Sequence, residues 1–177
     1  MKELTYKICI FGEGGVGKTT LTRRYLTGLF EVDTKMTMGA EIFVKNIDIE
    51  EYRIVLQIWD FGGEEMFRFL LPAYAKGSSG GLYMFDMTRY NTLKRTKEWL
   101  SIFEGGLTPE EKGIPILLIG GKLDLQDQIA VNQEEAERLV KEHNLFKFVE
   151  CSAKTGENVE LLFEILVRKI MKDSGFL

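Results

Sequence analysis

The sequence of 177 residues has little of what marks secreted, membrane-spanning or nucleic-acid-binding proteins. Its two cysteines, Cys9 and Cys151, each lie in or beside an apolar run, which indicates buried free thiols in a reducing compartment and excludes a disulfide scaffold. No apolar run approaches the roughly 18 residues of a membrane span, and the run in the first residues is too short for a signal peptide. The net charge of -4 offers no general attraction to a phosphate backbone. We therefore expect a cytoplasmic protein that does not bind nucleic acid.

Two further features carry little functional signal. The one dense basic run, Lys94, Arg95 and Lys97, falls in a helical pattern, where we expect a solvated face. The single histidine, His143, lies near the end of an expected helix and is interpreted as structural or solvated. Function must therefore be sought in other motifs.

Short β-rich runs alternate with segments of helical periodicity. A hairpin is expected from residues 40–49 and 53–60, in which Ile54, Leu56 and Ile58 point to one face. The other strands are expected at 5–11, 81–86, 114–120 and 146–151, and residues 104–113 are expected to form a surface loop. Strands joined in this way by helices require right-handed crossovers. The pattern predicts an α/β fold in one domain over residues 1–177, with a six-stranded, mostly parallel sheet, one antiparallel edge strand and helices on both faces.

Helix starts are also readable in the sequence. A helix is expected from about Lys18 to Thr27. Asn132, with Glu135 three residues later, is expected to cap another, and Thr155 is expected to cap the last helix. The last helix has one apolar stripe, formed by Val159, Leu162, Phe163, Leu166 and Ile170.

Residues 12–19, GEGGVGKT, match the phosphate-binding pattern G-x-x-x-x-G-K-[ST] between an expected strand and an expected helix. Glycines let the backbone turn so that successive N–H groups point at phosphate oxygens, and the helix N-terminus adds positive charge. Lys18 is expected to reach the β and γ phosphates, and the Thr19 hydroxyl to bind Mg²⁺. The predicted phosphate contacts are Glu13, Gly14, Gly15, Val16, Gly17, Lys18, Thr19 and Thr20.

Further motifs follow in order, and with them the whole chain resembles a small GTPase of the Ras superfamily, Rab-like and Ras-like, with some Arf-like character in FGG. The resemblance implies a three-layer G domain that binds GTP or GDP with Mg²⁺. It implies that Phe30 lies against guanine and that Thr37, in TMG of the first switch, binds Mg²⁺. In WDFGGEE, the second switch (residues 59–65), it implies that Asp60 holds a Mg²⁺-bound water and that the Gly63 N–H contacts the γ phosphate.

The base-reading motifs of that family also have counterparts. In GGKLD, residues 120–124, the resemblance implies that Asp124 accepts hydrogen bonds from guanine N1 and N2 and that the Lys122 stem lies over the base. In CSAK, residues 151–154, it implies that the Ala153 N–H contacts guanine O6, with Ser152 and Lys154 beside it.

Two departures from the family pattern matter. Gly121 stands where an asparagine amide would bond the base and tie the loop to the phosphate-binding loop, so we expect weaker nucleotide affinity. Glu64 stands where a glutamine orients the attacking water, and a carboxylate there would repel developing negative charge. Lys35 is the only cation near the first switch, which lacks an arginine. We expect slow hydrolysis in which Lys18, Thr37, Gly63 and Glu64 take part.

The alternatives are a module that holds guanine nucleotide without cleaving it, and a kinase of small metabolites, for which an arginine-rich lid is missing. Exchange factors, activating proteins and effectors are expected at the switch loops of a monomer. Neither end carries a lipidation motif, so membrane contact would need a missing tail or a partner. The apolar candidates for a partner surface are Met36, Met38, Phe67 and Phe69, which alternatively pack under the loops.

Overall fold

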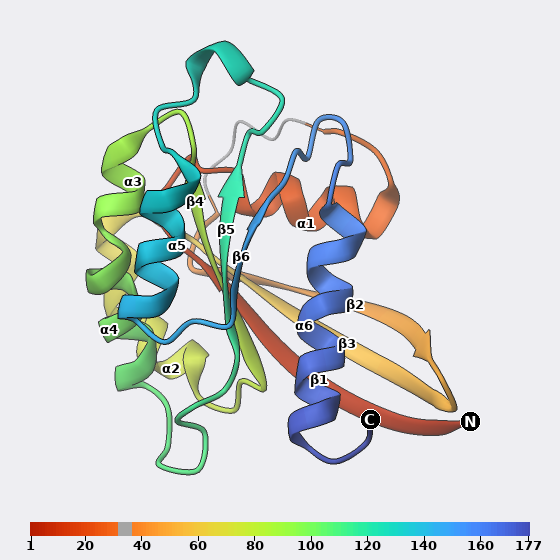
Figure 1. Cartoon of the computed structure of the whole chain (residues 1–177). Coiled ribbons are helices and arrows are strands. Elements are labelled where there is room, and N and C mark those ends of the chain that lie inside the picture. Colours follow the sequence, from red (N-terminus) through yellow and green to blue (C-terminus); the bar gives the residue numbers. More distant parts are fainter. Residues whose placement is uncertain (32–36) are drawn as a thin grey trace.

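In the computed structural model, which describes residues 1–31 and 37–177, one sheet runs through the molecule with helices on both faces (Figure 1). The strand order is β2-β3-β1-β4-β5-β6, in which only β2 and β3 pair antiparallel. The elements in chain order are β1 (Lys2–Phe11), α1 (Lys18–Thr27), β2 (Ala40–Ile49), β3 (Tyr52–Phe61), the 3-10 helix η1 (Glu65–Leu70), α2 (Leu71–Ala75), β4 (Gly80–Asp86), α3 (Tyr90–Lys94), α4 (Thr96–Gly105), β5 (Ile116–Gly121), the 3-10 helix η2 (Gln126–Gln128), α5 (Gln133–Glu142), β6 (Lys147–Glu150) and α6 (Val159–Asp173). The predicted fold class is confirmed.

The two faces of the sheet bury separate apolar clusters because side chains alternate along each strand. Figure 1 shows α1 and α6 on one face and α2 to α5 on the other. Under α1 and α6, the rings of Tyr25 and Phe163 stack with centroids 3.9 Å apart. Under the other helices, Phe11 stacks on Phe103 at 4.4 Å. β4 and β5, buried along their whole length, are the central strands expected from their continuous apolar runs.

The predicted hairpin face and apolar stripe lie in this core. Ile54, Leu56 and Ile58 have no exposed surface, and the stripe residues of α6 are buried. Cys9 and Cys151 are buried free thiols as predicted, and burial raises the pKa of each to about 12. Both thiols therefore stay protonated and unreactive at neutral pH.

The start of the last helix was predicted wrongly. α6 begins at Val159, and the Thr155 hydroxyl instead accepts a hydrogen bond from the Glu157 N–H at 3.2 Å. Gly156, with φ of 86°, turns the chain before the helix can begin. The other predicted cap is confirmed, because Asn132 Oδ1 accepts from the Glu135 N–H at 2.9 Å.

The basic run is also not one solvated helical face. α3 ends at Lys94 and α4 begins at Thr96, and Arg95 at the junction is ion-paired (see below). Lys94 and Lys97 are exposed as predicted. The expected surface loop is shorter than predicted, because α4 extends to Gly105 and Leu107 is buried. Within the described ranges, no helix has the length and apolar character needed to cross a membrane.

Candidate functional site

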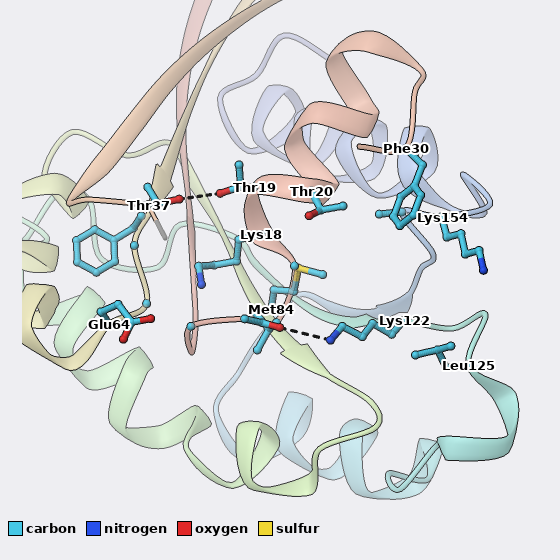
Figure 2. A pocket seen from close by; sticks show the side chains of 18 of the residues that line it. Lys18, Thr19, Thr20, Phe30, Thr37, Glu64, Met84, Lys122, Leu125 and Lys154 are labelled. Atoms are coloured by element: carbon cyan, nitrogen blue, oxygen red, sulfur yellow. Dashed lines mark hydrogen bonds between the residues drawn. The ribbon is translucent and has the colours of Figure 1, made fainter. Parts of the chain in front are cut away.

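A cavity of about 490 Å³ lies beyond the carboxyl ends of the parallel strands, where such sheets bind ligands (Figure 2). The phosphate-binding loop follows β1, and the CSAK motif follows β6. The second switch begins in the last residues of β3, and the GGKLD motif begins in the last residues of β5. Sequence-predicted residues that line the cavity are Gly14, Gly15, Val16, Gly17, Lys18, Thr19, Thr20, Phe30, Thr37, Gly63, Glu64, Lys122, Asp124, Ala153 and Lys154. The fold thus brings six separate segments of the chain to one site.

The phosphate-binding loop packs directly on the backbone of β4. A Cβ on Gly12, whose φ is 147°, would lie 2.2 Å from the Met84 carbonyl oxygen, so this position admits only glycine. Lys18, 6% exposed, donates to the Gly12 oxygen at 2.9 Å and to the Glu13 oxygen at 2.6 Å. Burial lowers the pKa of Lys18 to about 8, against the opposing effect of nearby carboxylates, Asp60 foremost. The ammonium group is held by the loop carbonyls at the cavity wall.

Hard oxygen atoms gather beside Lys18. The hydroxyls of Thr19 and Thr37 lie 2.9 Å apart, and Thr19 Oγ1 donates to Asp60 Oδ2. Asp60 is fully buried, and no described residue forms a hydrogen bond with its Oδ1 atom. Burial raises the pKa of Asp60 to about 6, although the Thr19 hydrogen bond and the Lys18 charge oppose it. Two hydroxyls and an unpaired carboxylate oxygen fit the ligands that Mg²⁺ prefers.

Asp60 does not line the cavity itself but lies behind Thr19, as suits a group that acts through a water. Among the described residues there is no cluster of three or more His, Cys, Asp or Glu side chains that would hold a metal alone. A cation here would need phosphate and water oxygens to complete its shell.

The second switch lies on the phosphate-binding loop. A Cβ on Gly63 would fall 2.3 Å from the Gly12 carbonyl oxygen, so only glycine lets the two backbones approach this closely. This contact carries Glu64 over the loop, where its Oε1 atom lies 2.6 Å from the position of a Cβ on Gly14. The carboxylate therefore occupies the end of the cavity that also holds Lys18 and Thr37 (Figure 2).

The other end of the cavity has a different character. Figure 2 places Phe30, Lys122, Leu125 and Lys154 there, and Phe30 is 40% exposed at the margin. Asp124 Oδ1 accepts from the Ser152 hydroxyl at 2.8 Å. The Ser152 side chain is buried and does not line the cavity, and its hydroxyl holds the Asp124 carboxylate instead.

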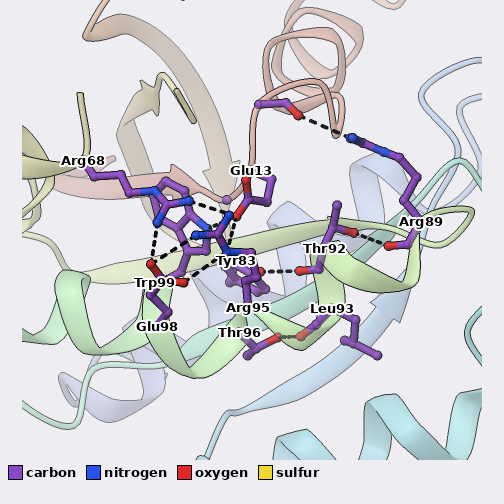
Figure 3. A network of polar contacts seen from close by, with 12 residues as sticks. Glu13, Arg68, Tyr83, Arg89, Thr92, Leu93, Arg95, Thr96, Glu98 and Trp99 are labelled. Carbon is purple, nitrogen blue, oxygen red and sulfur yellow. Dashed lines mark hydrogen bonds and ion pairs between the residues drawn. The ribbon is translucent and has the colours of Figure 1, made fainter. Parts of the chain in front are cut away.

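The Glu13 side chain does not line the cavity and instead joins a polar cluster outside it (Figure 3), so the phosphate contact predicted for this residue would come from its backbone N–H. Its Oε1 atom accepts from Trp99 Nε1 at 2.9 Å and from Arg68 Nη2 at 3.2 Å, and it lies 3.0 Å from Arg95 Nε. Arg68 is 9% exposed, lies over the Trp99 ring and also pairs with Glu98. This cluster joins the phosphate-binding loop, η1 and α4.

Sequence reasoning missed this cluster, because its members are far apart in the chain and carry no local motif. It also missed Arg89, whose Nη2 atom donates to the Gly14 oxygen at 3.3 Å, and it missed four residues that line the cavity. These four are Phe61, Gly62, Met84 and Leu125. Phe61 and Gly62 lie within the second-switch motif, residues 59–65, so the sequence offered a signal for these two residues.

Comparison with known proteins places this site in a family. A Ras family model matches residues 7–172. Ras-related protein RABA5b of Arabidopsis thaliana is 36% identical over 172 residues, which are 97% of this chain and 77% of that protein. Ras-related protein Rab-18-B of Danio rerio is 36% identical over 171 residues, 97% of this chain and 82% of that protein. The chain belongs to the family that this model describes and is a Rab-like small GTPase of the Ras superfamily, which binds guanine nucleotides.

Proposed function

We propose that this GTPase is a Mg²⁺-dependent switch whose own hydrolysis of GTP is slow. The observation that carries the proposal is the place of Glu64, whose carboxylate lies over Gly14 at the phosphate end of the cavity. Hydrolysis transfers the γ phosphoryl group to water through a transition state rich in negative charge. A fixed negative charge at this place opposes that transition state.

The phosphates would be held by backbone N–H groups of the loop and by Lys18. The Lys18 ammonium group, now held by the Gly12 and Glu13 carbonyls, would exchange these acceptors for phosphate oxygens. Thr19 and Thr37 would bind Mg²⁺ directly and Asp60 through a water. When bound, the ion neutralises phosphate charge. The Gly63 N–H would contact the γ phosphate, so that loss of this group releases both switches.

The base would lie between Phe30 and the Lys122 stem, with Lys154 beside it. Asp124, oriented by Ser152, would accept from guanine N1 and N2, and the Ala153 N–H would donate to O6. Adenine offers no matching pair of donors, so this carboxylate selects guanine. The amide that Gly121 lacks would weaken affinity by on the order of 1 kcal/mol.

The test is single-turnover hydrolysis of radiolabelled GTP with Mg²⁺, for the native chain, Glu64→Gln and Glu65→Gln. Glu65 is an exposed neighbour and controls for the loss of one carboxylate. We expect native turnover at or below roughly 10⁻⁴ s⁻¹. Glu64→Gln should be faster, because an amide orients water without repelling phosphate, and Glu65→Gln should be unchanged. Native turnover many-fold above this value without any partner would refute the proposal.

A second function, a module that holds guanine nucleotide without cleaving it, is favoured by Glu64 and Gly121 together. It predicts that GTP stays bound and intact in both the native chain and Glu64→Gln. The same assay, with nucleotide release followed in parallel, separates the two.

We also propose that residues 1–177 act as one G domain and as a monomer. Regulators and effectors would meet the switch surface, where Met38 and Phe69 are 72% and 76% exposed and Phe67 is half-buried. Met36 and Lys35 lie outside the described residues. Any contact with a membrane would be peripheral and reached through a partner or a tail.

A further inference from the structure

The space beside Gly121 is filled by Met84. Gly121 is the last residue of β5, and Met84 lies on the neighbouring strand, β4. A Cβ on Gly121 would be 2.5 Å from the Met84 terminal methyl carbon, and Met84 is only 2% exposed. The same methyl lies 3.6 Å from the Cβ position of Gly17 in the phosphate-binding loop. An asparagine side chain does not fit at position 121 while Met84 occupies this place.

A buried carboxylate stands next to Gly121 in the sheet. Asp86 ends β4, is the register partner of Gly121, and has a side chain that is 1% exposed. Its Oδ2 atom accepts from Lys122 Nζ at 2.7 Å and from Arg89 Nε at 3.1 Å. Its Oδ1 atom accepts from the N–H and the hydroxyl of Thr88 at 2.8 and 2.6 Å. Every contact of this carboxylate is therefore with a donor, and its orientation is fixed.

The two cations that bind Asp86 also donate hydrogen bonds to backbone oxygens of the phosphate-binding loop. Lys122 Nζ lies 3.4 Å from the Gly15 oxygen (Figure 2), and Arg89 Nη2 lies 3.3 Å from the Gly14 oxygen (Figure 3). Asp86 also binds both cations, through Lys122 Nζ and through Arg89 Nε. The carboxylate thus links the base-reading loop, which carries Lys122, to the loop that cradles phosphate.

The charge on Asp86 persists despite its burial. Burial by itself raises the pKa of this carboxyl, but hydrogen bonds from Lys122, Thr88 and Arg89 together hold its pKa below the ordinary value. An ionised group accepts stronger hydrogen bonds than a neutral one.

We propose that Asp86 is a positioning residue for guanine nucleotide binding, which ties the two loops through Lys122 and Arg89 in place of the amide that Gly121 lacks. The inference rests on the guanine-nucleotide site proposed above. Met84 fills the place that an asparagine side chain at position 121 would take, and Asp86 joins the two loops without that amide. The two loops hold opposite ends of the nucleotide, so loosening the tie should speed its release.

The test measures release of a fluorescent GDP analogue from the native chain and from Asp86→Asn, with an exposed carboxylate variant, Asp127→Asn, as control. Asp86→Asn should release GDP about tenfold faster or more, since two charge-assisted hydrogen bonds weaken. Asp127→Asn should release it at the native rate. Thermal unfolding of each chain with GDP bound shows whether it is folded.

The effect of Asp86→Asn in a second, double-variant chain distinguishes a link between the two loops from a general structural role of Asp86. Met84→Val with Gly121→Asn makes room for the missing amide and restores it. There, Asp86→Asn should speed release by less than about threefold, because the amide now carries the tie. The same acceleration in both backgrounds would overturn the proposal.

A double-mutant cycle of Asp86→Asn and Arg89→Ala in the native chain tests the same proposal if the chain with Met84→Val and Gly121→Asn does not fold. Arg89→Ala should speed release several-fold, and adding it to Asp86→Asn should change little, because both remove one tie. Independent, multiplying effects would overturn the proposal, as would GDP release from Asp86→Asn at the native rate. If the native chain holds no guanine nucleotide, the proposed function fails as well, and that outcome is distinct from an unchanged release rate.

Discussion

Asp60→Asn should stabilise the nucleotide-free protein and destabilise the loaded one. Asp60 is fully buried, and one of its carboxylate oxygens has no hydrogen-bond partner within residues 1–31 and 37–177. Burial raises its pKa from 3.8 to about 6, so the folded chain binds this proton more tightly than the unfolded chain does. Asparagine has the same shape and no charge to desolvate.

The magnitude follows from the two pKa values. The raised pKa of Asp60 adds folding stability that is fully present below pH 3.8 and is lost as the pH rises through 6. At pH 7.5 Asp60 is ionised, and the folded protein bears the full free-energy cost of burying its charge. Two units of pKa correspond to about 3 kcal/mol. Asp60→Asn should therefore raise the free energy of unfolding by up to about 3 kcal/mol at pH 7.5 and by less than about 1 kcal/mol near pH 4.

The assay is urea unfolding followed by circular dichroism, with EDTA and without nucleotide, across this pH range. With Mg²⁺ and GDP added, Asp60→Asn should lower the free energy of unfolding instead of raising it. The cation compensates the charge of Asp60, and an asparagine amide cannot make that interaction. An equal effect of Asp60→Asn at pH 4 and 7.5 without nucleotide would refute the reasoning. Failure of the sign to reverse would argue against a metal beside Asp60.

The sequence predicts the phosphate end of the site well because that end is contiguous in the chain. The glycines, the lysine and the threonine of residues 12–19 follow a strand and open a helix, so their local geometry determines where the N–H groups point. The parallel sheet supplies the rest, since the carboxyl ends of its strands meet along one edge. Asp60 and Asp124 reach the site for that reason.

Contacts between side chains distant in sequence could not be predicted in the same way. Glu13 belongs to the motif, yet its partners Arg68, Arg95 and Trp99 are set by how η1 and α4 pack on the sheet. Gly121 was recognised as a departure, but Met84, which fills the vacated space, lies on another strand. Compensation of this kind depends on packing and leaves no pattern in a single sequence.

Three further changes test other parts of the structure. Asn132→Ala removes the helix cap of α5 and should lower the free energy of unfolding by about 1 kcal/mol, measured by urea unfolding. Gly63→Ala places a methyl 2.3 Å from the Gly12 backbone oxygen, so the second switch must move away from the phosphate-binding loop. GTP should then be released faster, while the rate of GDP release changes little. Equal acceleration of both rates would contradict this prediction. Glu13→Gln keeps an acceptor for Trp99 but removes the charge that pairs with Arg68, a side chain only 11% exposed. Because Arg68 keeps its ion pair with Glu98, Glu13→Gln should lower the free energy of unfolding by about 1–3 kcal/mol, less than if a buried cation were left wholly unpaired. Urea unfolding followed by tryptophan fluorescence measures it, with the exposed Glu104→Gln as control. If the two variants unfold alike, the cluster adds no more than a surface ion pair, and η1 is not held to α4 through Glu13.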